Sequence, residues 1–268
     1  MGTLILAVTA LFLYSVGTAL QALHFRGRVH SNTAITTLIG MLALTAHGLL
    51  ITQTILHDGG VDFSFFKSTV LISWLIVFLL LGLNLRKPVQ SLFLGAYPLA
   101  AFTLITALIT HMPSRLVSDE NYGVLSHIAL SVTAYSLFSL AAIQAVLLYF
   151  QNNQLKRNYN SALVRNLPPL QTMESVLFEM VWAGVVMLIL AIVTGALFVE
   201  NLFAQNLAHK TVFSLLSLMV FVALLVGRHT KGWRGITASR WTLSGCALLM
   251  LAFYGSKFAI ELVFRKGG

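Results

Sequence analysis

Histidines are the side chains with the widest chemical scope in this otherwise apolar sequence, which contains eight of them. The imidazole ring ligates metals, carries protons and forms hydrogen bonds near neutral pH. Five of the eight stand beside Arg residues or at the ends of apolar stretches, where contact with a membrane interface explains them: His24, His30, His57, His111 and His229. The other three are candidates for a function and are considered one at a time: His47, His127 and His209.

His47 lies near the middle of the apolar stretch 33–56. About nine residues separate it from the nearer end, which at 1.5 Å rise per residue places it well inside a hydrocarbon layer. A polar ring at that depth must find a partner, which favours a ligand or relay role, although a hydrogen bond to a neighbouring helix also explains it. Gly48 beside it removes a side chain and lets a flat ligand or another helix approach.

His127 stands about one turn inside the start of the stretch 124–150, at helical rise. Ser131 and Tyr135 follow at i+4 and i+8, so the three predict a polar stripe directed at the interior of a helix bundle. His209 precedes Lys210 at the start of the stretch 208–227. Each histidine is either a ligand or an interfacial hydrogen-bonding residue.

Haem suits these histidines better than a bare metal ion. Its porphyrin needs an apolar slot and its iron accepts axial imidazole, whereas zinc and copper usually need three or four converging ligands. The chain has one cysteine, Cys246, and no closely spaced pair of histidines. We therefore expect haem b as the cofactor, with His47 and His127 as candidate iron ligands and His209 as a third candidate. His47 and His127 differ in depth by about 9 Å at helical rise, so they form one site only if helix tilt narrows that gap.

The elements that position these side chains are membrane-spanning helices. Hydrophobic residues make up 57% of the 268 and charged residues 9%, far below the roughly 25% charged residues of soluble domains. This excludes a soluble globule and predicts an all-α polytopic membrane protein, one eight-helix domain over residues 1–268, in contact with lipid throughout. The expected spans are 3–23, 33–56, 66–85, 91–110, 124–150, 175–200, 208–227 and 240–263.

Charge sorts the loops between these spans and explains the net charge of +9 without nucleic acid as a partner. Basic residues gather in alternate loops, which should face the cytoplasm: Arg26, Arg28, Arg86, Lys87, Lys156, Arg157, Arg165, Arg228, Lys231, Arg234 and Arg240. Both termini then face the periplasm, and the first span reads as retained because it lacks a basic region before it.

Pro168 and Pro169 end the longest loop, 151–172, and exclude a helix continuing through it. Glycines inside the spans predict close helix contacts: Gly40, Gly95, Gly184, Gly195 and Gly245.

Several segments together resemble the cytochrome c assembly (CcsA/CcmC-like) family of bacterial inner-membrane proteins, in its YpjD and HemX branch. They are 125–135, Leu167-Pro168-Pro169-Leu170, 209–213, Lys231-Gly232-Trp233-Arg234-Gly235 and Phe253-Tyr254-Gly255-Ser256, and the resemblance spans nearly the whole chain. It implies a haem-handling protein whose working end faces the periplasm. By this resemblance His47 matches the membrane histidine of the second span, and His127 matches a histidine at an outer helix end.

Two departures from the haem-exporting members limit what the resemblance implies. Residues 201–209 contain no Trp and no Asp where the Trp-rich haem-presenting motif should lie, and no histidine follows Phe253. We therefore expect a haem-binding or haem-handling protein that is not a complete haem lyase and carries no catalytic constellation. The alternative is a membrane accessory or scaffold protein without haem, which stabilises or regulates a partner complex and uses the basic loop 151–172 as its partner surface.

Overall fold

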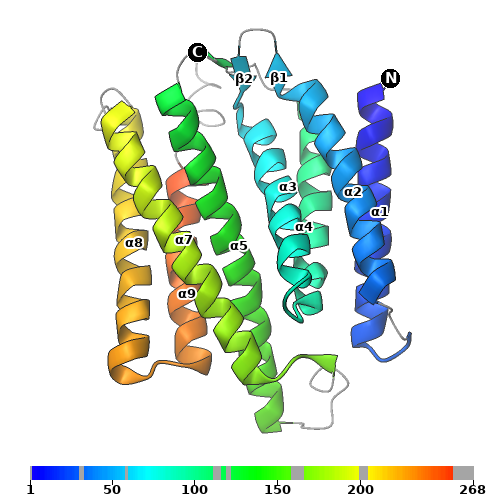
Figure 1. Cartoon of the computed structure of the whole chain (residues 1–268), viewed down its shortest axis with the longest axis vertical. Coiled ribbons are helices and arrows are strands. Elements are labelled where there is room, and N and C mark those ends of the chain that lie inside the picture. The colour runs from blue at the N-terminus through cyan, green and yellow to red at the C-terminus, as the bar shows by residue number, and fades with distance from the viewer. Residues whose placement is uncertain are drawn as a thin grey trace. The chain divides into compact units, whose positions relative to one another are not determined.

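The computed structural model describes residues 2–29, 33–57, 60–110, 116–118, 122–157, 166–198 and 205–255. Eight helices in this part of the chain are long and apolar enough to cross a membrane, as the sequence predicts. The helices, shown in Figure 1, are α1 (Gly2–Phe25), α2 (Thr33–Thr54), α3 (Phe65–Asn84), α4 (Phe93–Ile109), α5 (Tyr122–Arg157), α7 (Leu170–Phe198), α8 (Gln205–Lys231) and α9 (Gly235–Met250). A 3₁₀ turn, η1 (Gln90–Leu92), precedes α4, and a π-helical turn, η2 (Leu251–Gly255), continues α9.

The observed helix ends extend several predicted spans. Helix α5 continues to Arg157, seven residues past the predicted end at 150, and α9 begins at Gly235 rather than at 240. The α5 extension, 151–157, is polar, because a helix can continue beyond the hydrocarbon layer while a search for charge-free windows stops at its edge. The α9 extension, 235–239, carries no charge and lies on the other side of Arg240, the first residue of the predicted span. Helix α7 begins at Leu170, directly after Pro168 and Pro169 and five residues before the predicted start at 175. Residues 256–263 of the predicted eighth span lie outside the described residues.

The chain divides into two compact units. The first comprises residues 1–121 with 150–172, and the second comprises 122–149 with 173–268. The first unit therefore contains α1 to α4, and the second contains most of α5 together with α7, α8 and α9. His47 belongs to the first unit, whereas His127 and His209 belong to the second.

In the first unit, α1 packs against α2 and α4, and α3 packs against α2 and α4. Three short antiparallel strands, ordered β1-β2-β3, lie at the end where α2 stops and α3 starts (Figure 1): β1 (Leu56–His57), β2 (Gly60–Asp62) and β3 (Leu116–Ser118). The sequence predicts loops for these residues, except for Leu56, which ends the predicted span 33–56. Strands of two or three residues are too short to carry a periodic hydrophobic pattern, so sequence periodicity does not predict them.

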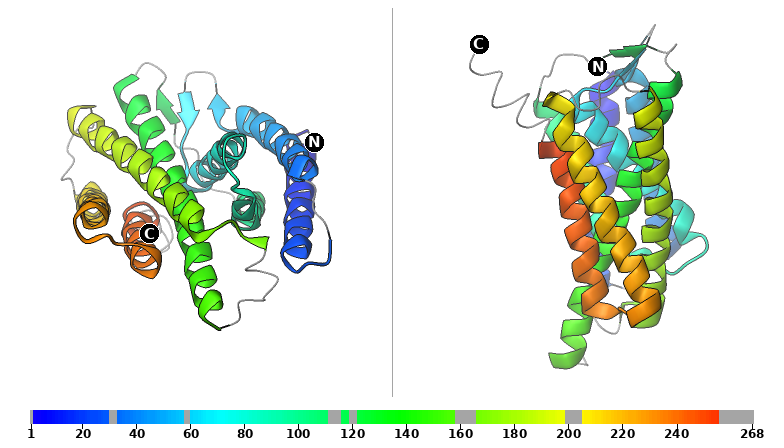
Figure 2. Two further views of the ribbon diagram at one scale, coloured as in Figure 1. Left: turned by 60° about the horizontal axis from the view of Figure 1, so that its bottom comes forward. Right: turned by 90° about the vertical axis from the view of Figure 1, so that its left-hand side faces the viewer.

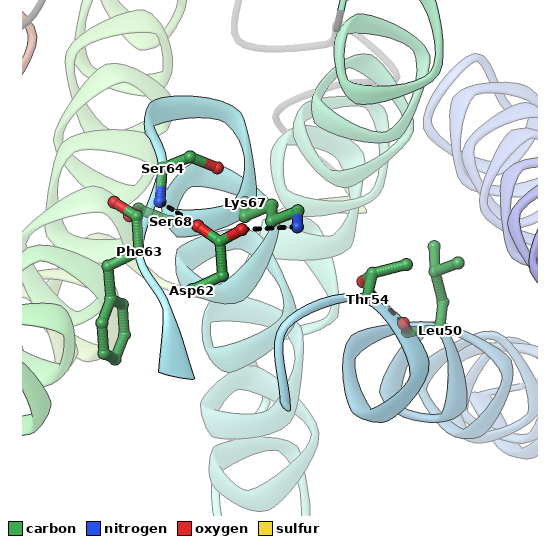
Figure 3. A network of polar contacts seen from close by, with 7 residues as sticks. All are labelled: Leu50, Thr54, Asp62, Phe63, Ser64, Lys67 and Ser68. Carbon is green, nitrogen blue, oxygen red and sulfur yellow. Dashed lines mark hydrogen bonds and ion pairs between the residues drawn. The ribbon is translucent and has the colours of Figure 1, made fainter. Parts of the chain in front are cut away.

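Asp62 forms an ion pair at the start of α3 (Figure 3). Its carboxylate is fully buried, accepting a hydrogen bond from the Ser64 backbone N–H at 2.9 Å and pairing with the Lys67 ammonium at 2.7 Å. A carboxylate at a helix N-terminus also interacts favourably with the helix dipole. Lys67, a charged residue near the start of an apolar span, is thereby paired within the protein.

In the second unit, glycines allow the close contacts that the sequence predicts. A Cβ atom at Gly184 would lie 2.8 Å from the Phe138 ring, and one at Gly245 would lie 2.7 Å from the Phe221 ring. Phe138 and Phe221 stack on each other with ring centroids 3.9 Å apart. Helices α8 and α9 pack side by side, as Figure 1 and both views of Figure 2 show.

The turn between α8 and α9 is built around Gly232 and Trp233. Gly232 adopts a left-handed backbone conformation with φ +64°, which favours glycine. The Trp233 ring lies against Gly227 of α8, where any Cβ would overlap it, and stacks on Trp241 of α9 with centroids 4.8 Å apart. The Lys-Gly-Trp-Arg-Gly segment thus forms an aromatic turn that joins two helices.

Glu174 of α7 caps the start of α9. Its carboxylate accepts a hydrogen bond of 2.7 Å from the backbone N–H of Gly235, the first residue of α9, where no side chain of the local sequence supplies a cap. We expect Glu174→Ala to lower the free energy of unfolding by about 1 to 2 kcal/mol, the range for losing a helix cap. Thermal unfolding in detergent measures this, with Glu174→Gln as the control because its amide oxygen can still accept the hydrogen bond. Equal losses in both variants would contradict the cap.

Large apolar side chains remain exposed along the spans, which fits contact with lipid. Phe12 is 65% exposed, Phe102 63% and Leu197 71%. In a water-soluble chain such a distribution would mark an interaction surface or an aggregation hazard. On helices that cross a membrane it is the surface that faces the hydrocarbon tails.

Candidate functional site

His47 is fully buried in the first unit. One of its ring nitrogens lies near the Tyr14 hydroxyl, and the other has no hydrogen-bond partner in the described residues. The ring is 0% exposed, and its Nδ1 lies 3.3 Å from the hydroxyl of Tyr14 on α1. The Val70 backbone of α3 is a further polar neighbour of the ring. Nε2 nevertheless has no hydrogen-bond partner within the described residues. A buried nitrogen left in this way is uncommon, since most buried polar atoms are paired.

Tyr97 of α4 packs against Tyr14 and helps to hold the Tyr14 ring beside His47. Its ring lies 5.5 Å from the ring of Tyr14, and its hydroxyl donates to the Thr36 carbonyl of α2 at 3.1 Å. Two glycines make room for it: a Cβ at Gly17 would lie 2.8 Å from the Tyr97 ring, and a Cβ at Gly40 would overlap the phenol oxygen. Tyr97 is thereby fixed between α1 and α2, and in turn restricts the position of Tyr14.

Gly48 allows a helix, rather than a flat ligand, to approach beside His47. A Cβ at Gly48 would lie 3.1 Å from Nε1 of Trp74 on α3. The same indole N–H donates to the Leu44 carbonyl of α2 at 3.1 Å. The sequence left open whether a flat ligand or another helix lies beside Gly48. In the structure helix α3 lies there, and Trp74 fills the space.

His127, in the second unit, also has one nitrogen engaged by protein. Its Nδ1 lies 2.7 Å from the Ala191 carbonyl of α7, which makes Nδ1 the protonated nitrogen because a carbonyl can only accept. Gly195, one turn further along α7, makes room for the ring, since a Cβ there would lie 2.8 Å from it. The ring is half-buried, and its Nε2 carries the lone pair. This is the usual state of an imidazole that binds a metal.

The predicted polar stripe on α5 meets two different helices. His127 bonds to α7, whereas the Tyr135 hydroxyl donates to the Leu249 carbonyl of α9 at 2.9 Å. Tyr135 also contacts Phe253 of η2, with ring centroids 5.1 Å apart. The stripe therefore faces the interior of its unit, as its spacing predicts.

The remaining histidines of the described residues have surface or local roles. His209 is exposed near the start of α8, so this candidate lies away from the buried contacts. The Nδ1 atoms of His24 and His229 lie within hydrogen-bond distance of carbonyls four or five residues away in the chain, at 3.3 Å and 2.9 Å. His30 and His111 lie outside the described residues.

No group of three or more His, Cys, Asp or Glu side chains that could hold a metal ion occurs among the described residues. Each candidate histidine is instead a single imidazole among apolar and aromatic side chains. This donor set lacks the converging ligands of a zinc or copper site, whereas a single imidazole can hold haem iron.

Sequence reasoning missed the aromatic residues around His47. Tyr14, Trp74 and Tyr97 come from three different helices, and no local motif links them. One signal was present in the sequence: Gly17 and Gly40 lie in the interiors of apolar helices, where glycine indicates close approach by a bulky neighbour.

The fold and these histidines define a class, a multi-pass helical membrane protein with single buried imidazoles. Residues 35–263 match the model of the cytochrome c assembly protein family, and the chain belongs to this family. It is 30% identical to the inner membrane protein YpjD of Escherichia coli (strain K12) over 97% of this chain and 99% of that protein. It is 25% identical to protein HemX of Brevibacillus brevis, over 91% of this chain and 92% of that protein.

These comparisons confirm the resemblance drawn from the sequence and its inner-membrane location. The chain is a multi-pass inner-membrane protein of this family. No solved structure gives a significant match.

Proposed function

We propose that this protein binds haem b in the inner membrane and handles it for a membrane or periplasmic partner, with His47 as an iron ligand. One observation carries the proposal: the Nε2 atom of His47 is buried without a hydrogen-bond partner in the described residues, while Nδ1 is held by Tyr14. Membership of the cytochrome c assembly family supports haem as the group that Nε2 would meet.

The residues around both candidate histidines fit such a group. At His47 the imidazole packs edge to face against Tyr14 with Nε2 buried and unpaired in the described residues, and at His127 the glycine of α7 leaves the imidazole the space that a Cβ would fill. In each case Nδ1 is engaged by a protein oxygen, which leaves Nε2 for iron. When bound, the iron would supply axial coordination sites and one-electron redox chemistry.

The side chains would then have separate tasks. His47 would bind iron and Tyr14 would orient its ring, while apolar helices exclude water. His127 would provide a second binding position in the other unit, near the helix ends at which α7 stops and α8 starts. His209, exposed beside Lys210, is the third candidate and would act at the surface. By the charge of the loops, this end of the second unit faces the periplasm.

The proposal is binding and transfer rather than catalysis. Residues 201–209 lack the Trp and Asp of the haem-presenting motif, so we do not propose attachment of haem to a cytochrome. No nucleophile paired with a base occurs at either histidine among the described residues. The role needs a partner that takes or delivers haem.

The visible spectrum of the protein tests the proposal directly. Protein purified in mild detergent from haem-replete cells should show a Soret band, and addition of haemin to haem-poor preparations should restore it. A membrane protein of similar size without buried histidines serves as the control for haem dissolved in the detergent. A preparation whose absorbance matches that control would overturn the haem assignment.

A further inference from the structure

The Tyr14 hydroxyl is placed to act on His47, and the Tyr97 ring is its aromatic neighbour. Its side chain is 0% exposed, and its hydroxyl has His47 as its hydrogen-bond partner in this part of the chain. The two rings meet edge to face, with centroids 5.9 Å apart. Tyr97 packs behind it and is itself anchored at Thr36, so Tyr14 has a fixed position.

The hydroxyl can pair with Nδ1 in two ways, because tyrosine both donates and accepts hydrogen bonds. If Tyr14 donates, Nδ1 carries the lone pair and the proton sits on Nε2. If Tyr14 accepts, the proton sits on Nδ1 and Nε2 carries the lone pair. A neutral imidazole binds iron only in the second state.

Without a ligand the first state is favoured. It leaves one group without a hydrogen bond, the Nε2–H, and the nearby Val70 backbone further favours a protonated ring nitrogen. The second state leaves both the Nε2 lone pair and the tyrosine hydrogen unpaired, and each unpaired buried group costs free energy because its hydrogen bonds to water are not replaced. Ligand binding at Nε2 reverses this preference, because the lone pair is then used.

We propose that Tyr14 is the positioning residue of His47: its hydroxyl oxygen accepts the Nδ1–H when Nε2 binds haem iron, and donates to Nδ1 when it does not. The exchange moves one proton between the two ring nitrogens, so the imidazole stays neutral and no charge enters the membrane. This inference rests on the proposed function and names the residue that controls its ligand.

The hydrogen bond from Nδ1–H to Tyr14 has a measurable effect on the iron. An acceptor at Nδ1 makes the imidazole a stronger electron donor, which stabilises ferric more than ferrous iron. Loss of such a partner typically weakens metal binding by about 10-fold to 100-fold. A 10-fold loss specific to the ferric state raises the midpoint potential by about 59 mV for a one-electron couple.

The experiment compares Tyr14→Phe with Tyr135→Phe in the full-length protein loaded with haemin. Both variants remove one phenol hydroxyl, but the Tyr135 hydroxyl bonds to the Leu249 backbone carbonyl in the second unit and has no part in holding Tyr14 or His47. Redox titration should show a higher midpoint potential in Tyr14→Phe, by about 59 mV or more. Tyr135→Phe should keep the value of the wild type.

The possible results separate this inference from the proposed function. A Tyr14→Phe protein with the potential of the wild type, or equal shifts in the two variants, would overturn the role of Tyr14 alone. A wild-type protein that shows no Soret band after addition of haemin would overturn the haem assignment and this inference with it.

A measurement on the wild type covers the case in which Tyr14→Phe does not fold. Nitrogen NMR of ¹⁵N-histidine-labelled protein distinguishes the two tautomers, and a spectrum of His47→Ala assigns the signal. We expect Nε2–H in ligand-free protein and Nδ1–H after loading with zinc protoporphyrin, a diamagnetic probe. The same tautomer in both states would contradict the exchange.

Discussion

Replacement of His47 by alanine should reduce haemin binding more than any other single substitution in the chain. Loss of a second-shell partner already weakens metal sites by about 10-fold to 100-fold, so loss of the ligand itself should exceed about 100-fold. Titration of the Soret band against added haemin measures this in detergent. His229→Ala is the matched control, because that histidine is exposed, lies against the Leu225 carbonyl of its own helix and is not a candidate ligand.

The substitution should leave the fold largely intact. His47 contributes one hydrogen bond, to Tyr14, and carries one unpaired nitrogen whose removal offsets part of that loss. The fully buried ring also leaves a cavity, so thermal unfolding without haemin should show a loss of about 2 to 5 kcal/mol, and haemin binding is compared at a temperature at which both proteins remain folded. If His47→Ala binds haemin normally while His127→Ala does not, the ligand is in the second unit and our assignment of His47 is wrong.

Much of the fold can be predicted from the sequence because lipid imposes simple rules. Backbone groups must pair internally in hydrocarbon, so each apolar stretch of about 20 residues becomes a helix. The eight predicted spans are confirmed on this ground. These rules do not apply outside the hydrocarbon layer. The predicted span therefore ends too early for α5 and starts too late for α9, and the three strands near Asp62 are not predicted.

The depth of His47 is the part of the site that the sequence predicts, since position within a span can be read from the residue count. Its partners cannot be read in this way, because Tyr14 and Val70 depend on which helices become neighbours. The same holds for His127, whose hydrogen-bond partner is a backbone carbonyl 64 residues away. Backbone acceptors carry no sequence signal, so a tautomer fixed by one can only be recognised in the fold.

The ring of Tyr97 makes Gly40 the glycine whose replacement should destabilise the first unit most. We expect Gly40→Ala to lower the free energy of unfolding by about 1 to 3 kcal/mol, the range for an overpacked core. The phenol oxygen occupies the place of the new Cβ, and it cannot withdraw easily because Gly17 and Thr36 hold the ring on either side. Unfolding in mixed detergent micelles measures the change.

Gly82→Ala is the matched control, since it is also a glycine inside a spanning helix but has no atom within 4 Å of the new Cβ. It should be neutral or stabilise the protein by up to about 1 kcal/mol, because alanine favours helix more than glycine does.

Tyr97→Phe should partly rescue Gly40→Ala, because it removes the oxygen and leaves Cζ, 3.1 Å from the Cβ, as the nearest atom. A coupling of about 0.5 kcal/mol or more with this sign is expected for residues in direct contact. Strict additivity of the two substitutions would mean that Tyr97 does not hold α2 at Gly40, and that the ring supporting Tyr14 and His47 is free to move.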